Sequence, residues 1–172
     1  MESYDLSSTE FAELLRVMEI YDDEAHKCLA SGAYLAACAM LGAELEAVLL
    51  LVASVHTEEV EESPVRPQRG GKPRPMLSWK FWELLRVARD LGWLPSDWSI
   101  EIDADGRLIR ANDHADLVRR VRNLMHPARY IQDIPGGQVN EADLDICYRI
   151  VEEVIDHLGT ILGPAIHPSA VH

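Results

Sequence analysis

The stretch from Ala33 to Val55 constrains the fold more than any other part of the sequence. It is apolar nearly throughout, and its only charged residues are Glu44 and Glu46, near the middle. A segment of this length could cross a membrane, but each glutamate would cost about 2.5–3.5 kcal/mol at the centre of a bilayer. We therefore expect a buried central helix, from about residue 34 to 56, in a soluble protein.

Apolar residues at three- and four-residue spacing predict further helices around this one. Ser7 and Glu10 have the spacing of a capping box, and Ser78, Asn112 and Asn140 are the expected N-caps of the later helices. The ranges expected to be helical are about 9–31, 78–92, 112–127 and 140–159. The predicted fold class is all-α: a bundle of about five helices.

Length and cysteine usage limit the class of protein. The chain has 172 residues and fits a single domain, 1–172, because domains usually hold about 100–200 residues. Cys28, Cys38 and Cys147 stand far apart in the sequence among apolar residues, which indicates buried thiols rather than a disulfide framework or a zinc site. The N-terminus is acidic and lacks the apolar segment of a signal peptide, so we expect a cytoplasmic protein. We also expect neither a cofactor nor a metal.

Two segments between the helices have the composition of loops and turns. Residues 57–77 contain four glutamates, four Lys or Arg, four prolines and two adjacent glycines, which predicts a long exposed loop. Residues 98–110 alternate as a small β-hairpin does, with a turn at Asp103 to Gly106. This turn hints at a calcium loop, but it lacks the third ligand before the glycine and the glutamate after it. The chain is expected to end in a loose tail, 160–172.

Charge is distributed unevenly along this acidic chain, whose net charge at pH 7 is −13. Residues 1–27 and 141–160 are strongly acidic, whereas residues 109–130 hold five arginines and two aspartates. An acidic protein repels nucleic acid as a whole, so a phosphate ligand has to bind at a local basic patch. Summed in this way, 109–130 is the only basic region and the expected place for a phosphate.

One flank of the helix predicted there carries the candidate site. With residues placed 100° apart, four side chains share this flank: Arg119, Arg122, His126 and Arg129. Arg122 and His126 are one turn apart, and Pro127 cannot donate to the carbonyl of Asn123, so the helix frays or bends at the histidine. An arginine can hold two phosphate oxygens and a histidine can move a proton at neutral pH. This pair suits chemistry on a phosphodiester, and the 2′-hydroxyl of RNA would supply the nucleophile without a metal.

Structural interpretations of the same residues stay open. Arg122 could pair with a buried Glu46 while His126 only caps a helix end. Trp79 and Trp82 could stack on bases, or they could anchor a long loop or a dimer interface. A joint metal site of Glu44 and Glu46 is disfavoured, because residues two apart on a helix point in nearly opposite directions.

Three segments carry a resemblance to a known family. The run Arg122-Asn123-Leu124-Met125-His126-Pro127 looks like the "R-N-x-x-H-P" signature of the HEPN superfamily, most closely in uncharacterised bacterial proteins of the DUF4145 kind. Ala36 to Leu50 resembles the second helix of that family, and Leu84 to Leu94 resembles its third helix. The likeness covers roughly residues 10–160.

The resemblance implies a HEPN-like helical bundle, often a homodimer, whose Arg and His face a cleft shared by both subunits. Many members are metal-independent endoribonucleases of toxin or defence type. In such an enzyme Arg122 would stabilise the phosphate, His126 would be the general base or acid, and Asn123 would position the strand. Arg119 and Arg129 would add phosphate contacts.

Other members are not catalytic, and they bind nucleotides or promote dimerisation. The family's nuclease motif usually places more residues between Arg and His than the three found here. Together with the acidic net charge, this spacing favours a dimeric module that binds a nucleotide, an RNA phosphate or a protein partner through an Arg-Asn-x-x-His cleft. The apolar second helix also favours a homodimer. A metal-independent endoribonuclease using Arg122 and His126, with an antitoxin as a partner, is the alternative, and no membrane partner is expected.

Overall fold

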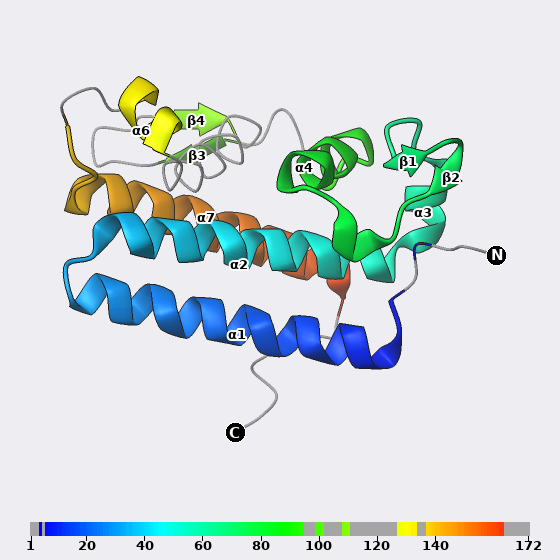
Figure 1. The fold of residues 1–172 in the computed structure, drawn as a ribbon, viewed down its shortest axis with the longest axis horizontal. Helices are drawn as coiled ribbons and strands as arrows, with labels where there is room; N and C mark the ends of the chain where they lie inside the picture. The colour runs from blue at the N-terminus through cyan, green and yellow to red at the C-terminus, as the bar shows by residue number, and fades with distance from the viewer. Residues whose placement is uncertain are drawn as a thin grey trace.

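The computed structural model describes Tyr4 and residues 6–94, 99–101, 108–110, 127–133 and 137–163. Within these residues the protein is mainly helical, with two short antiparallel hairpins (Figure 1). The helices are α1 (Ser8–Ala30), α2 (Tyr34–Val55), α3 (Thr57–Glu62), α4 (Phe81–Asp90), α6 (Pro127–Asp133) and α7 (Glu141–Leu162), with a 3₁₀ helix, η1, at Met76–Ser78. The strands are β1 (Gln68–Arg69), β2 (Lys72–Pro73), β3 (Ser99–Glu101) and β4 (Leu108–Arg110). The prediction of an all-α bundle with a small hairpin is confirmed.

The centre of the bundle is α2. It packs against α1 on one side and against α7 and α4 on others (Figure 1). Ala37, Cys38 and Ala39 are all buried, and three successive residues span about 200° of a helix. Neighbours therefore enclose α2 on several sides, so its apolar surface is already covered within one chain and does not by itself require a second copy.

Among the described helices, only α2 is long and apolar enough to cross a bilayer. Most of the residues in its apolar window are buried inside the bundle, as in the core helix of a soluble protein. Its two glutamates, Glu44 and Glu46, are half-buried. The burial of α2 is compatible with the soluble protein expected from the sequence.

Two of the bundle helices begin at the capping boxes predicted for them. Ser7 Oγ accepts a hydrogen bond from the N–H of Glu10 at 3.2 Å, and the Glu10 carboxylate accepts one from the N–H of Ser7 at 2.8 Å. Asn140 and Asp143 repeat this reciprocal arrangement at the start of α7. These bonds satisfy N–H groups that a helix leaves without intrahelical partners.

The end of α7 differs from the prediction. The tail was expected to be loose from residue 160, but the helix continues to Leu162, where Gly163 follows. Ile161 and Leu162 pack against the core, and this packing keeps the last turn helical. Residues 164–172 lie outside the described part of the chain.

Residues 57–94, which we call the connector layer, cover the side of α2 opposite α1 (Figure 1). The prediction of an exposed loop over 57–77 is wrong in part, because the segment folds into α3, the β1–β2 hairpin and η1. Most of its residues are exposed, but Val60, Ser63 and Met76 are fully buried. Single apolar residues at irregular spacing therefore attach this segment to the core, and they leave no periodic signal in the sequence.

The helix after the connector starts later than predicted. Ser78 was expected to cap it, but the Ser78 hydroxyl donates to the carbonyl of Pro75 at 2.6 Å and ends η1. Lys80 is the N-cap of α4, and the Glu83 carboxylate accepts from the Lys80 N–H at 2.8 Å. The helix stops before Gly92, whose φ of +75° suits glycine.

The predicted hairpin near 98–110 is confirmed: β3 pairs antiparallel with β4, with Ile100 opposite Ile109. The turn between them and the helix predicted from residue 112 lie outside the described residues. The chain is described again from Pro127, which begins α6. Proline suits the first helical position, because the N–H that it lacks would have no intrahelical acceptor there.

Candidate functional site: a pocket at the start of α2

Most of the predicted site residues cannot be placed. Arg119, Arg122, Asn123 and His126 lie outside the described residues, and of Arg129 only the backbone, within α6, is described. The predicted ion pair between Arg122 and Glu46 therefore stays a prediction. The last residue of the motif, Pro127, is described, and it is the first residue of α6.

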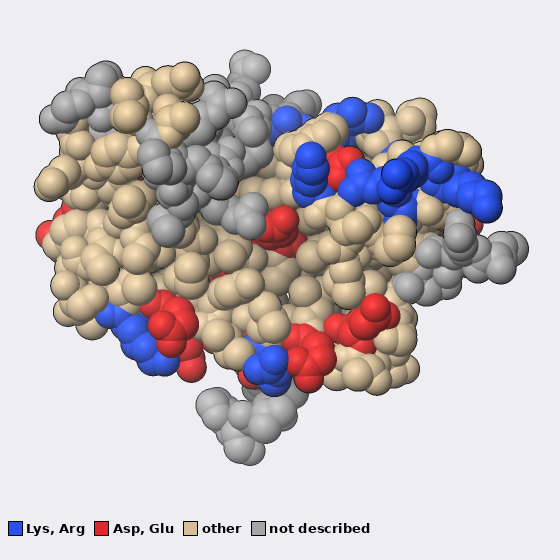
Figure 2. Space-filling view, in the orientation of Figure 1, with Lys and Arg blue, Asp and Glu red and all other residues tan. Residues whose placement is uncertain are grey.

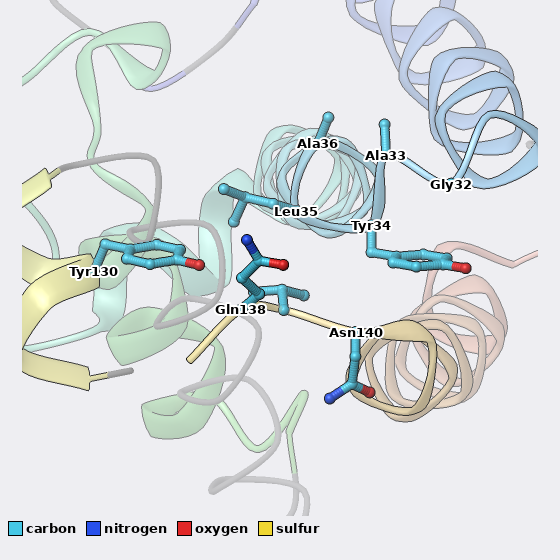
Figure 3. A pocket seen from close by; sticks show the side chains of 9 residues that line it. Gly32, Ala33, Tyr34, Leu35, Ala36, Tyr130, Gln138 and Asn140 are labelled. Atoms are coloured by element: carbon cyan, nitrogen blue, oxygen red, sulfur yellow. The ribbon is translucent and has the colours of Figure 1, made fainter. Parts of the chain in front are cut away.

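A pocket in the described part of the chain lies beside α6. It has a volume of about 620 Å³, which is within the usual range of about 300–1,000 Å³ for small-molecule sites. Its lining comes from the start of α2, from α6 and from the chain that leads into α7 (Figure 3). The lining residues are Gly32, Ala33, Tyr34, Leu35, Ala36, Tyr130, Gln138, Val139 and Asn140. Segments about 100 residues apart in the sequence thus form one concave surface.

Tyr130 is the side chain that α6 contributes to this pocket. It follows Pro127 by three residues, or about 4.5 Å along a helix axis. Its ring points toward Gln138 and Leu35 (Figure 3), and its hydroxyl donates to the carbonyl of Gly137 at 3.1 Å. This hydrogen bond connects α6 to the segment that precedes α7, and these two segments form two of the walls of the pocket.

The start of α2 gives the pocket a polar wall of a particular kind. Ala33 is the N-cap and provides no side-chain hydrogen bond, and the first turn contains no acidic residue. The first N–H groups of a helix have no intrahelical acceptor, and they carry a partial positive charge. Tyr34, Leu35 and Ala36, which belong to this turn, all line the pocket. The wall is therefore suited to a negatively charged or hydrogen-bond-accepting group.

A second polar cluster, which the sequence did not predict, joins α1, α2 and α7. The imidazole Nδ1 of His26 lies 3.0 Å from the carbonyl of Asp22, and its Nε2 lies 3.2 Å from the hydroxyl of Tyr148. The hydrogen bond with Asp22 raises the pKa of His26. Burial and the nearby Asp22 charge raise the pKa of Glu44 from 4.5 to about 7. The Asp22–His26 spacing is visible in the sequence, but nothing there places Tyr148 beside it.

The described side chains give no indication of a metal site. No group of three or more His, Cys, Asp or Glu within them is placed to hold a metal ion. The three cysteines are free thiols, and Cys38 and Cys147 are buried. Cys38 of α2 and Cys147 of α7 meet where these two helices pack together. The hydrogen bond between their thiols, together with burial, raises the pKa of the Cys147 thiol.

The expectation that 109–130 is the only basic region is wrong. Residues 66–89 contain seven Lys or Arg and a single carboxylate, Glu83. Summing the charge over 57–77 hid this, because the glutamates of α3 cancel the bases that follow them. In the fold these bases gather on one face (Figure 2).

Comparisons with models of protein families, with curated proteins and with solved structures find no match to this chain. The likeness to the HEPN superfamily therefore depends on the sequence motifs alone. The pocket and the two polar regions have to be interpreted from their own chemistry.

Proposed function

We propose that this chain is a HEPN-like helical module that binds a nucleotide or an RNA phosphate in the pocket between α2 and α6. The observation that carries this proposal is the position of the pocket, whose wall α6 begins at the residue that follows His126. The Arg-Asn-x-x-His motif and the pocket are then parts of one site, and the module binds its ligand without cleaving it.

The described lining supports a ligand with both an aromatic and an anionic part. Tyr130 provides a ring that points toward Gln138 (Figure 3), and stacking on an aromatic ring is worth about 1–3 kcal/mol per base. The uncapped first turn of α2 offers N–H groups to a phosphate. The exposed amide of Gln138 adds hydrogen-bonding groups to the lining, and Asn140, whose Oδ1 caps α7, adds its NH2 group.

The motif would supply the positive charge that the described lining lacks. In this proposal Arg122 holds the phosphate through two N–H donors, with Arg119 and Arg129 adding charge. Asn123 orients the ligand, and His126 donates a hydrogen bond to it. The net charge of −13 makes such a local concentration of arginine necessary for binding an anion.

The test is a calorimetric titration of adenosine monophosphate, uridine monophosphate and inorganic phosphate into the purified protein. Arg122→Ala is expected to weaken nucleotide binding by roughly tenfold or more, because a charge-assisted hydrogen bond contributes about 1.5–3 kcal/mol. Tyr130→Ala is expected to weaken nucleotide binding but to leave the weaker binding of inorganic phosphate unchanged. Arg16→Ala, on the exposed side of α1, is the matched control and should change neither. Equal affinities for all four proteins would refute the proposed site.

A metal-independent endoribonuclease is the second candidate, because a guanidinium and an imidazole one helical turn apart can converge on one phosphate, even though fewer residues separate Arg122 from His126 than in the family's usual nuclease motif. His126 would take the proton of the 2′-hydroxyl, whose oxygen attacks the phosphorus while the bond to the 5′-oxygen breaks. The leaving 5′-oxygen takes up a proton from the protonated His126 or from water, so the products are a 2′,3′-cyclic phosphate and a 5′-hydroxyl. Incubation of structured RNA with the protein in EDTA, beside Arg122→Ala and His126→Ala, tests this: cleavage by the parent alone supports the enzyme, and equal traces from all three exclude it.

The homodimer is proposed on the resemblance, since α2 is covered within its own chain. Light scattering of the protein at tens of micromolar tests it. A mass near twice 19.3 kDa is expected, and a monomer mass would remove the shared cleft from the proposal.

A further inference from the structure

The connector layer carries the largest concentration of positive charge among the described residues. The space-filling view has most of its blue atoms together, over α4 and the β1–β2 hairpin (Figure 2). We call the surface formed by residues 66–89 the basic face; the Lys and Arg residues of this segment are Arg66, Arg69, Lys72, Arg74, Lys80, Arg86 and Arg89. It is a different surface from the pocket at the start of α2, and a ligand could bind to it whether or not the pocket has the proposed function.

The tip of the hairpin places two of these cations side by side. Gly70 and Gly71 form the two-residue turn with φ values of +61° and +77°, a conformation that favours glycine at both positions. Arg69 on β1 is directly opposite Lys72 on β2, and both are exposed. Neither makes an ion pair with a described residue, so both charges remain available to a ligand.

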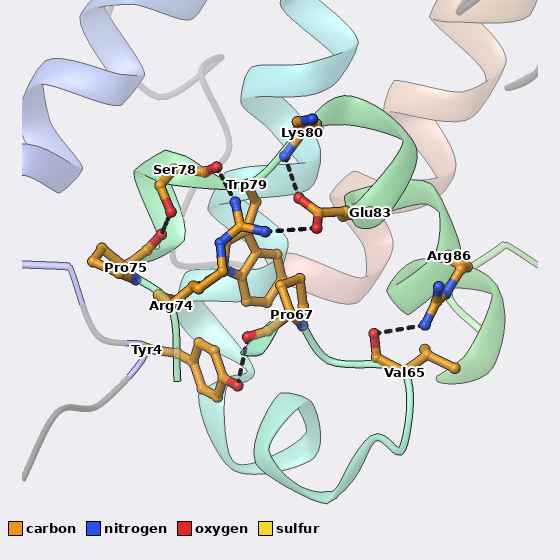
Figure 4. A network of polar contacts seen from close by, with 10 residues as sticks. All are labelled: Tyr4, Val65, Pro67, Arg74, Pro75, Ser78, Trp79, Lys80, Glu83 and Arg86. Carbon is orange, nitrogen blue, oxygen red and sulfur yellow. Dashed lines mark hydrogen bonds and ion pairs between the residues drawn. The ribbon is translucent and has the colours of Figure 1, made fainter. Parts of the chain in front are cut away.

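The hairpin is firmly attached to the rest of the layer. The Arg74 guanidinium, which lies at the base of the hairpin, pairs with the Glu83 carboxylate of α4 at 2.7 Å (Figure 4). The indole N–H of Trp79 donates to the Arg74 carbonyl at 3.1 Å, and the Tyr4 hydroxyl donates to the carbonyl of Pro67 at 3.1 Å. These bonds hold the hairpin and α4 in a fixed relation, so a ligand spanning both would not have to order them first.

Glu83 is the only carboxylate between residues 66 and 89, and Arg74 neutralises it. Of the remaining cations, Lys80 and Arg86 are exposed on or beside α4. The Arg86 guanidinium lies 5.7 Å from the ring centre of Trp82, whose side chain is 44% exposed. An indole open to solvent beside a guanidinium is a surface on which a nucleobase can stack.

We propose that the basic face binds the backbone of single-stranded nucleic acid. Arg69 and Lys72 at the hairpin and Lys80 and Arg86 at α4 contact successive phosphates, while Trp82 stacks on a base between them. Arginine outnumbers lysine five to two on this face, and the guanidinium fork matches phosphate oxygens better than an ammonium group does. A flexible strand can follow this face without meeting the acidic side of α1, which covers the opposite side of α2 (Figure 1).

The first experiment separates this face from the overall charge. Fluorescence anisotropy measures the binding of a labelled oligouridine of about 20 nucleotides at about 50 mM and 200 mM salt. The double variant Arg69→Glu/Lys72→Glu is compared with Arg16→Glu/Lys27→Glu, which makes the same change in net charge on α1. The hairpin variant is expected to bind at least tenfold more weakly, and its salt dependence should fall by a slope of roughly 1.4 for two lost phosphate contacts. The α1 variant should weaken binding less than threefold.

A second pair of variants tests the stacking. Trp82→Ala is expected to weaken binding roughly fivefold or more, whereas Trp82→Phe keeps an aromatic surface and should recover most of the loss. Because Trp82 is exposed, neither change should alter the circular dichroism spectrum.

The proposal would be overturned if the parent did not bind oligouridine at low salt, or if the hairpin and α1 variants lost binding equally. Equal binding by Trp82→Ala and the parent would also overturn it. Tighter binding to phosphatidylserine vesicles than to the oligonucleotide would assign the face to a membrane instead. Arg122→Ala distinguishes this site from the pocket. Oligouridine binding that is lost in Arg122→Ala but kept in the hairpin variant would assign the strand to the pocket instead.

Discussion

The bundle of α1, α2 and α7 and the connector layer differ in how their partly buried polar groups are paired. In the bundle, the Glu44 carboxylate is half-buried without a cation strong enough to offset its desolvation, and its pKa is raised to about 7. In the connector layer the Glu83 carboxylate is similarly shielded, but Arg74 pairs with it at 2.7 Å. The buried Ser63 hydroxyl likewise donates to Asp90 at 2.7 Å.

This difference reflects how much apolar surface each region has. The bundle has long apolar stripes along three helices, so it tolerates a poorly solvated carboxylate at its edge. The connector layer has only a few buried side chains before α4 and depends on hydrogen bonds and one shielded ion pair to keep its shape. We therefore expect substitutions to affect stability through packing and pH in the bundle, and through single anchors in the layer.

The largest expected effect is at Trp79, the anchor of the layer. Its ring is buried, lies against Tyr4 in an edge-to-face contact at 5.3 Å, and donates to Arg74. Trp79→Ala is expected to lower the free energy of unfolding by about 3–5 kcal/mol, as measured by urea denaturation. Trp82→Ala is the matched control, because Trp82 is exposed and its loss should cost less than about 1 kcal/mol. Similar losses for the two variants would mean that the layer does not depend on a single anchor.

The next effect tests the shielded ion pair. Glu83→Gln leaves the partly buried Arg74 guanidinium without its carboxylate, and it should lower the free energy of unfolding by about 1–3 kcal/mol. Glu13→Gln breaks an equally short pair with Arg16, but both side chains there are exposed to solvent. That control should change stability by less than about 0.5 kcal/mol. A loss at Glu13 as large as that at Glu83 would contradict the contrast between the two environments.

These two regions also differ in how much of them the sequence predicts. The bundle helices were predicted nearly to their first residues, because apolar periodicity and the capping pairs Ser7–Glu10 and Asn140–Asp143 are local signals. In the connector layer the helix before Gly92 was predicted, and Trp79 as an anchor of a long loop was one of the interpretations left open. The fold of residues 57–77 was not predicted, because Val60 and Met76 stand singly and their burial depends on α2 and α4. Its basic face was missed for a related reason: four glutamates and four bases cancel in a sum over 57–77, although they belong to different elements, α3 and the hairpin region.

The pocket at the start of α2 was only partly predictable, for the same reason. The motif that we propose as part of this site ends at Pro127 and is a sequence feature, but Tyr34 and Tyr130 carry no local signal that would bring them together. Contacts between segments about 100 residues apart depend on how the chain folds back so that α7 packs on α2, which periodicity does not determine. The sequence could therefore suggest a phosphate ligand, which stays a prediction, but it could not predict the pocket beside α6.

The pH dependence of stability comes next in size. Because burial raises the pKa of Glu44 from 4.5 to about 7, the folded protein keeps this proton over a pH range in which the unfolded chain has lost it. The free energy of unfolding therefore falls as the pH rises from 4.5 to about 7. The pKa of His26 is also raised, so its contribution is likewise lost as the pH rises through the folded-state pKa.

Glu44→Gln should remove most of this dependence. The variant is expected to exceed the parent in free energy of unfolding by on the order of 1–2 kcal/mol at about pH 8, after allowance for partial exposure, and by little near pH 5. Urea denaturation at both pH values measures this. The exposed Glu19→Gln is the control and should follow the parent at each pH. A parent more stable at pH 8 than Glu44→Gln would show that this carboxylate is stabilised rather than desolvated.

The smallest effect separates stability from ligand binding at the pocket. Asn140 caps α7 through hydrogen bonds to the N–H groups of Ala142 and Asp143, and Ser7 caps α1 in the same way. Asn140→Ala and Ser7→Ala should each lower the free energy of unfolding by about 1 kcal/mol. Only Asn140 lines the pocket, so only its variant should also weaken nucleotide binding when titrated well below the unfolding temperature. If both variants bind nucleotide equally well, the cap is only structural and the ligand contacts Tyr34, Tyr130 and the start of α2 without it.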